Sequence, residues 1–270
     1  MSRDMTVRVT TRAVSDTRAR PRAGLFGQTA GMVASNGFVL VTGGSRGIGA
    51  ATARLAAERG SDVCISYRDR ADSAEAVVTD CERIGVSALA VPADVSQEQD
   101  VLRLFATASD ALGALGALVN NAGVLDRQAR VVDLEAARIE RILAVNVLGS
   151  FLCAREAVRR MSTRGGGAGG AIVNVSSRAA VLGGPGEYVD YAASKAAVDT
   201  LTIGLSREVA DEGIRVNAVR PDSSSPTSMR AVVSRGGCSG CRSRCRCSEA
   251  ARPRRLPRRS SGCSPTARPT

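Results

Sequence analysis

The segment from Phe38 to Gly60 constrains the fold of this chain more than any other. Phe38-Val-Leu-Val-Thr42 is a short apolar run rich in β-formers, which predicts a buried strand. A glycine loop, Gly43-Gly-Ser-Arg-Gly-Ile-Gly49, follows at once, and the Ala/Arg/Leu-rich stretch 50–59 predicts a helix that ends at Gly60. Glycines permit a tight turn, and the first turn of a helix offers free N–H groups and a positive dipole to a phosphate. The segment therefore predicts a phosphate-binding strand–loop–helix unit.

The alternation of strands and helices continues along the chain. Strands are predicted near 37–42, 62–67, 87–92, 116–120, 171–176 and 214–219. Helices are predicted near 47–59, 70–84, 97–112, 134–163 and 188–212. This order is typical of an α/β fold with a doubly wound parallel sheet, Rossmann-like, in a single domain of about 185 residues.

Lys195 is the only lysine among 37 Lys and Arg residues, and it follows Tyr191 by four positions. A site that keeps Lys in so Arg-rich a chain indicates a need for an ammonium on a flexible stem. On a helix, positions four apart share a face, and a cation beside a phenol lowers the phenol pKa. The spacing predicts that Tyr191 is a general acid/base, whereas the alternative is a surface pair on an ordinary helix.

Five separated motifs together resemble the short-chain dehydrogenase/reductase family over residues 37–221. They are Thr42-Gly43-xxx-Gly47-x-Gly49, Asn120-Asn121-Ala122-Gly123, Asn146, Ser176-Ser177 and Tyr191-xxx-Lys195, in that order. The resemblance implies an NAD(P)-binding oxidoreductase that interconverts a small-molecule carbonyl and a secondary alcohol.

The resemblance also assigns catalytic roles. Tyr191 transfers the proton, Lys195 lowers its pKa and bonds the nicotinamide ribose, and Asn146 holds a water that links Lys195 to solvent. Ser177 bonds the substrate oxygen, with Ser176 as the alternative because this loop is one residue longer than in many relatives. Tyr188 remains an alternative phenol, although it lies two helical turns from Lys195.

The cofactor is predicted to be NADP, with NAD as the alternative. Tyr67 stands where NAD-preferring relatives usually carry an acidic residue, and Arg68 and Arg46 suit a 2′-phosphate. The alternative for both arginines is solvated surface charge. By resemblance, the Asp94 side chain and the Val95 backbone hold the adenine. The expected cofactor-binding residues are Gly43, Ser45, Arg46, Gly47, Ile48, Gly49, Arg68, Asp94, Val95, Asn121, Ala122, Gly123, Tyr191 and Lys195.

The basic character of the chain lies in its two ends. Residues 1–36 carry a net charge of +4, residues 37–221 carry −2, and residues 222–270 carry +9. The central segment therefore gives no basis for a nucleic-acid surface. The leader 1–36 is interpreted either as a basic, transit-like arm or as sequence preceding a true start at Met32. No signal-peptide or membrane-spanning run is found, so a cytoplasmic protein without a membrane partner is expected.

The tail 222–270 departs from the family pattern and is predicted to be disordered. It holds five of the eight cysteines, and Cys238-x-x-Cys241 suggests zinc, but the chain has no histidine and no metal site is expected. Restoring one nucleotide near codon 222 recovers a Gly-apolar-apolar-x-Thr-Asp pattern, which indicates a frameshift. A seventh strand is therefore expected to be missing, and the homo-oligomer that the resemblance implies loses its usual contacts. Two alternatives stay open: a catalytically impaired, truncated dehydrogenase that at most binds cofactor, and a tail that binds metal or nucleic acid.

Overall fold

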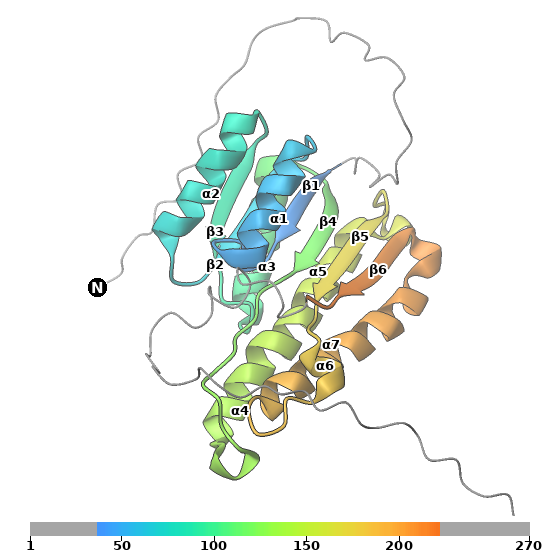
Figure 1. Ribbon diagram of the computed structural model, residues 1–270. Coiled ribbons are helices and arrows are strands. Elements are labelled where there is room, and N and C mark those ends of the chain that lie inside the picture. Colours follow the sequence, from blue (N-terminus) through green and yellow to red (C-terminus); the bar gives the residue numbers. More distant parts are fainter. Residues whose placement is uncertain (1–36, 222–270) are drawn as a thin grey trace, which may run out of the picture. The chain divides into compact units, whose positions relative to one another are not determined.

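The computed structural model describes residues 37–221 (Figure 1). The predictions for the leader 1–36 and the tail 222–270, including the frameshift and the missing seventh strand, lie outside the described residues.

Six parallel strands form one sheet in the order β3-β2-β1-β4-β5-β6. The strands are β1 Phe38–Val41, β2 Val63–Tyr67, β3 Ala88–Pro92, β4 Leu115–Asn120, β5 Gly170–Val175 and β6 Ile214–Val219. The chain order reverses between β1 and β4, which is the point where such sheets bind ligands at the carboxyl ends of their strands. Within residues 37–221, β6 pairs with β5 alone and forms one edge of the sheet.

Helices cover both faces of the sheet, with α1 and α2 on one side and α3, α5 and α7 on the other (Figure 1). The helices are α1 Gly47–Glu58, α2 Ala71–Ile84, α3 Glu98–Leu112, α4 Ala136–Leu143, α5 Gly149–Met161, α6 Ala179–Leu182 and α7 Val189–Glu208. Short helical turns lie at η1 Val131–Asp133, η2 Ala144–Leu148, η3 Thr163–Gly165 and η4 Ala210–Glu212.

Strand β1 shows why the sheet needs both layers. All four of its residues are buried, and successive side chains point to opposite faces. Phe38 and Leu40 pack into the cluster that contains α3 and α5, whereas Val39 and Val41 pack into the cluster that contains α1 and α2. A strand that is apolar at every position therefore belongs between two helical layers.

The predicted doubly wound sheet is confirmed, and every strand lies within one residue of its predicted ends. The helix predicted over 134–163 is a continuous helical run, and its α4 and α5 parts are joined by the π-helical turn η2, which the prediction did not include. Gly149 begins α5 against Val95, where a Cβ atom would lie 2.7 Å from the valine Cγ2. The turn η2 occurs where the helix passes the end of β3 and where Asn146 turns inward, and π-helical turns often mark functional sites.

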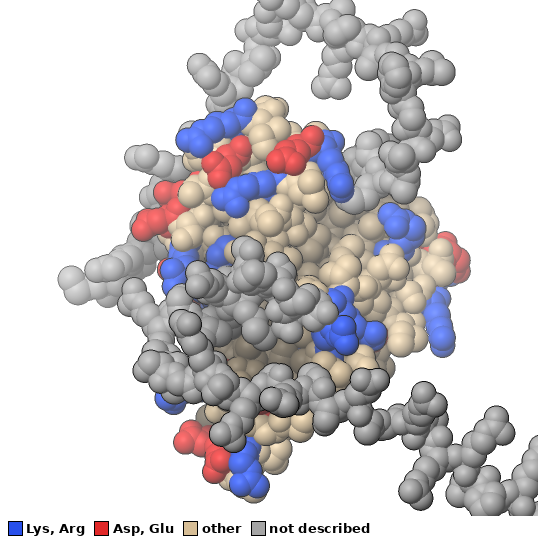
Figure 2. Space-filling view, viewed as in Figure 1, with Lys and Arg blue, Asp and Glu red and all other residues tan. Residues whose placement is uncertain are grey.

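Charged side chains on the face shown in Figure 2 lie in small separate groups, with acidic residues among the basic ones. None of the helices in the described range 37–221 is long and apolar enough to cross a membrane.

Candidate functional site

A cavity of about 610 Å³ lies along the carboxyl ends of the central strands. Its volume is within the range of about 300–1,000 Å³ usual for ligand pockets. The predicted site residues that line it are Gly43, Ser45, Arg46, Gly47, Ile48, Arg68, Asp94, Val95, Asn121, Ala122, Gly123, Ser177, Tyr191 and Lys195. Gly49 and Asn146 do not line the cavity, because both are buried next to residues that do.

The glycine loop is fixed by the neighbouring strand β2. Gly43 and Gly47 adopt φ values of +63° and +56°, a left-handed conformation that glycine tolerates without strain. The Gly43 N–H donates to Ser66 Oγ at 3.2 Å, and the Gly44 N–H donates to the Ser66 carbonyl at 2.9 Å. Sequence reasoning missed Ser66, which at the end of an apolar strand gives no signal of its own. The first turn of α1 is thereby held at the wall of the cavity.

Asn121 joins the end of β4 to the same loop. Its Nδ2 donates to the carbonyls of Thr42 and Gly43 at 2.9 and 3.0 Å. Thr42 Oγ1 in turn accepts from the backbone N–H groups of Asn121 and Ala122, both at 3.0 Å. The predicted cofactor residue Asn121 thus commits its amide nitrogen to shaping the loop.

Guanidinium groups border the end of the cavity near β2. Arg46, Arg68 and Arg70 all line it, and Arg70 was not among the predicted residues. Arg68 Nε donates to Asp69 Oδ2 at 2.8 Å, but both side chains are more than half exposed. An exposed pair of this kind contributes little energy, so a phosphate can compete for the guanidinium. The charge at this end suits an anion.

Asp94 and Val95 lie at the carboxyl end of β3, at the wall of the cavity. Asp94 Oδ1 accepts from the Ser96 N–H at 2.9 Å and from Ser96 Oγ at 2.7 Å. The Asp94 N–H donates to Asp100 Oδ2 at 2.9 Å, close to the start of α3. These bonds fix the orientation of the carboxylate that is expected to meet the adenine.

The π-helical turn directs Asn146 toward the loop after β4. Its Oδ1 accepts from the Val124 N–H at 2.7 Å, and its Nδ2 donates to the Val124 carbonyl at 3.0 Å and to Ser194 Oγ at 2.9 Å. A Cβ atom on Gly123 would lie 3.3 Å from Asn146 Oδ1 and 3.4 Å from Lys195 Nζ. The absence of a side chain at Gly123 therefore lets the loop pass close to both groups.

Tyr191, Ser177 and Lys195 meet at the other end of the cavity. The Ser177 hydroxyl lies close enough to the Tyr191 phenol to lower its pKa. Lys195 Nζ lies 5.7 Å from the centre of the Tyr191 ring and donates to the Val175 carbonyl at 2.7 Å. Ser176, the alternative serine, is buried and donates from its Oγ to the Lys195 carbonyl at 3.3 Å. Of the two serines, only Ser177 affects the pKa of the phenol.

The pKa shift of Tyr191 differs from the one that the spacing of Tyr191 and Lys195 predicts. Burial raises the pKa of Tyr191, and the hydrogen bond with Ser177 opposes part of the rise. Burial lowers the pKa of Lys195 to about 8, and the Asp199 carboxylate acts in the opposite direction. The expected lowering of the Tyr191 pKa by Lys195 is not found, because the ammonium donates to Val175 and desolvation dominates at the phenol.

The arrangement of these groups fits a dinucleotide. Two left-handed glycines, a helix N-terminus and nearby guanidinium groups form a cradle for phosphate at one end, and a phenol stands at the other. Between Gly37 and Pro221, no cluster of three or more His, Cys, Asp or Glu side chains could hold a metal ion. The zinc alternative concerns Cys238 and Cys241, which lie outside the described residues.

Three comparisons with known proteins agree with this geometry. Residues 37–236 match the family described as short chain dehydrogenase. The chain is 56% identical over 184 residues to the uncharacterized oxidoreductase YgfF of Escherichia coli strain K12, which covers 68% of this chain and 74% of that protein. It is 42% identical over 184 residues to cis-4-hydroxycyclohexanecarboxylate dehydrogenase of Sinomonas cyclohexanicum, over 67% of this chain and 71% of that protein. The crystal structure of a short chain dehydrogenase from Burkholderia cenocepacia J2315 in complex with NADP superimposes with a TM-score of 0.65 and 38% identity, over 69% of this chain and 74% of that chain.

Proposed function

Because the chain belongs to the short-chain dehydrogenase/reductase family of oxidoreductases, we propose that it transfers a hydride between NADP(H) and a small carbonyl compound or its alcohol. The observation that carries the proposal is the contact of Tyr191 with Ser177, with Lys195 one turn away, in the same cavity as the glycine loop. The Sinomonas relative supports a secondary alcohol as substrate, since its name describes a dehydrogenase of a hydroxycyclohexane acid.

In the reduction, bound NADPH supplies the hydride, and the chain supplies the proton. Tyr191 protonates the carbonyl oxygen, and Ser177 bonds the same oxygen because its hydroxyl already meets the phenol. The raised pKa keeps the phenol protonated at neutral pH, which is the form that a proton donor needs. Lys195 stabilises the phenolate left after transfer, since an ammonium favours the charged form of a nearby phenol.

Asn146 is proposed to support this chemistry from beneath the cavity. Through its Nδ2 it holds Ser194 Oγ, which donates to the Tyr191 carbonyl at 2.6 Å. We also propose that Asn146 retains a water that connects Lys195 with solvent.

NADP rather than NAD is proposed because Arg46 and Arg68 border the cavity where the adenosine half of a dinucleotide would lie. A charge-assisted hydrogen bond contributes about 1.5–3 kcal/mol, so Arg68→Ala should weaken NADPH binding about 10- to 100-fold. NADH lacks the 2′-phosphate and provides the matched control, because its Kd should stay unchanged in the same variant. A wild-type protein that binds NADH more tightly than NADPH would contradict the assignment.

Turnover of NADPH with a panel of ketones tests the reaction. Tyr191→Phe should lower kcat by about 10²- to 10⁴-fold, the usual contribution of a positioned acid. Tyr188→Phe removes the alternative proton donor of the sequence analysis and should leave most of the activity. The reverse pattern would assign the proton to Tyr188.

A second candidate is a protein that binds the cofactor without turnover. It is favoured by α6, where Leu182 lines the cavity and is 63% exposed and the neighbouring Val181 is 70% exposed. A substrate wall made of exposed apolar side chains holds a ketone poorly in the geometry that reaction needs. Saturable NADPH binding without activity on any ketone would select this candidate.

A further inference from the structure

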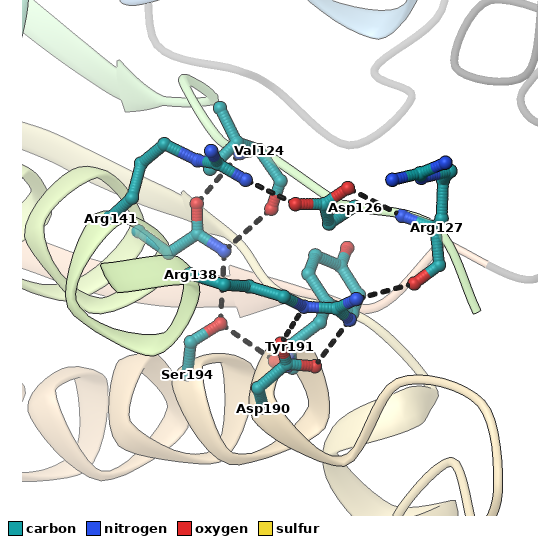
Figure 3. Close-up of polar contacts among 9 residues, drawn as sticks. Val124, Asp126, Arg127, Arg138, Arg141, Asp190, Tyr191 and Ser194 are labelled. Atoms are coloured by element: carbon teal, nitrogen blue, oxygen red, sulfur yellow. Dashed lines mark hydrogen bonds and ion pairs between the residues drawn. The ribbon is translucent and has the colours of Figure 1, made fainter. Parts of the chain in front are cut away.

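A buried ion pair lies directly beside Tyr191 (Figure 3). Arg138 of α4 donates from Nε to Asp190 Oδ2 at 2.7 Å and from Nη2 to Oδ1 at 3.3 Å. The side chains of Arg138 and Asp190 are only 13% and 2% exposed. Sequence reasoning did not identify either residue, because Arg138 is 52 positions before its partner in a chain full of arginine.

The same two side chains bind three separate parts of the fold. Asp190 Oδ1 also accepts from the Tyr191 N–H at 2.9 Å, in the first turn of α7. Arg138 Nη1 donates to the Arg127 carbonyl at 2.7 Å, in the loop after β4. That loop provides Val124 and Leu125 to the cavity wall. One guanidinium therefore connects α4, the wall of the cavity and the helix end that carries the phenol.

Removing the charges of Arg138 and Asp190 from water costs free energy, so this ion pair adds little to stability by itself. Burial pushes the pKa of Asp190 upward, but the hydrogen bonds from Arg138 and from the Tyr191 N–H outweigh it and leave the pKa below its usual value. The carboxylate and the guanidinium are thus both charged at neutral pH. An apolar pair of similar volume is often as stable as a buried ion pair, so the retained charges point to a geometric purpose.

We propose that Arg138 and Asp190 are positioning residues that fix the Tyr191 phenol relative to the cavity wall, an inference that rests on the proposed function of Tyr191. The first N–H groups of a helix have no partner within the helix, and its first turn frays unless they are bonded. Asp190 binds one of these groups, the N–H of Tyr191 itself, and its negative charge suits the positive end of α7. Arg138 then ties this turn to the Arg127 carbonyl across the site.

The test compares Arg138→Met, Asp190→Asn and the double variant Arg138→Met/Asp190→Leu in the full chain. The double variant leaves no unpaired buried charge and should fold, yet it lacks the connection to Tyr191 and to Arg127. Because a displacement of about 1 Å in a reacting group costs about 100-fold in rate, kcat should fall about 10- to 100-fold in all three. The KM for NADPH should stay within about twofold, since the pair lies away from the glycine loop.

Arg141→Gln is the matched control. Arg141 lies one turn further along α4 and pairs with Asp126 of the same loop, but it is 54% exposed. Its loss should leave kcat, KM and the melting temperature as in the wild type. A double variant with wild-type kcat would show that the pair only neutralises charge, and a fall in kcat that merely follows the folded fraction would equally overturn the proposal.

A spectroscopic measurement separates the failure of this proposal from the failure of the proposed function. The chain has three tyrosines, so the ¹³Cζ resonance of Tyr191 can be assigned with single Phe variants and titrated without any substrate. The resonance and its titration should change in the double variant and not in Arg141→Gln. Identical titrations in all proteins would refute the positioning role, whereas absent turnover in the wild type would refute only the proposed reaction.

Discussion

Replacing Gly49 by Ala tests whether the glycine loop and the end of β4 form one packed unit. A Cβ atom at Gly49 would lie 2.5 Å from Asn121 Nδ2 and 2.6 Å from the Gly43 carbonyl oxygen. Both separations are too short for real atoms, so the amide of Asn121 must move. The move breaks its hydrogen bonds with the carbonyls of Thr42 and Gly43.

The size of the effect follows from two contributions. Forcing an extra carbon into a packed site costs about 1–3 kcal/mol. Leaving a partly buried amide without its partners costs about 1–3 kcal/mol more, and relaxation reduces the sum, so about 2–4 kcal/mol is expected. In a domain of this size each kcal/mol shifts the melting temperature by about 2–4 °C, so Gly49→Ala should melt about 4–16 °C below the wild type. Its affinity for NADPH should fall as well, because the loop meets the cofactor.

Gly204→Ala is the control, since Gly204 lies in α7 and, among the described residues, no atom outside its chain neighbours and its own helix backbone comes within 4 Å of an added Cβ. An alanine there should raise stability by about 0.5–1 kcal/mol, the usual gain over glycine in a helix. Thermal unfolding followed by circular dichroism and NADPH titration measure both variants. If Gly49→Ala melted within 2 °C of the wild type and bound NADPH normally, the packing argument would be refuted.

Two further predictions concern a proton and a buried polar network. The kcat/KM for ketone reduction should fall as pH rises through about 8, because the buried Lys195 loses its charge there. Lys195→Arg should abolish this fall in the pH profile while lowering kcat, since a guanidinium keeps its charge. A wild-type pH profile of kcat/KM that is flat to pH 10 would contradict the prediction. Asn174→Leu should lower the free energy of unfolding in urea by about 1–3 kcal/mol, because Asn174 in the core accepts from Asn120 Nδ2 and donates to Thr202 Oγ1, both at 2.9 Å. The control Asn217→Ala, on the exposed side of β6, should change this free energy little. Equal losses of stability in the two variants would refute the role of the network.

The strands and most of the helices could be predicted because their signals are local. Each strand is an apolar run bounded by turn residues, and the order of strand and helix is enough to select a parallel sheet. The π-helical turn could not be predicted in this way. It depends on Gly149 meeting Val95 and on Asn146 bonding Val124, which are contacts between segments that lie far apart in the sequence.

The candidate site also contains residues that the sequence reveals and residues that it does not. The glycine loop, Tyr191 and Lys195 are visible as spaced motifs, and they line one cavity together. Ser66 and Arg138 are not visible, because a serine at a strand end and one arginine among many carry no local pattern. Their roles arise only when the fold places Ser66 under the glycine loop and Arg138 against Asp190.

The pKa of Tyr191 shows why the direction of a predicted pKa shift can be reversed in the folded protein. Spacing alone places an ammonium one turn from the phenol and so predicts a lowered pKa. Desolvation has no counterpart in the spacing, yet it raises the pKa of Tyr191 and lowers that of Lys195 to about 8. Burial thus shifts both groups toward their neutral forms, but Lys195 stays charged below about pH 8, and a phenol that keeps its proton is suited to donate it. The Lys195 charge becomes useful only as the phenolate forms, so the pair stabilises the product of proton transfer more than the resting state.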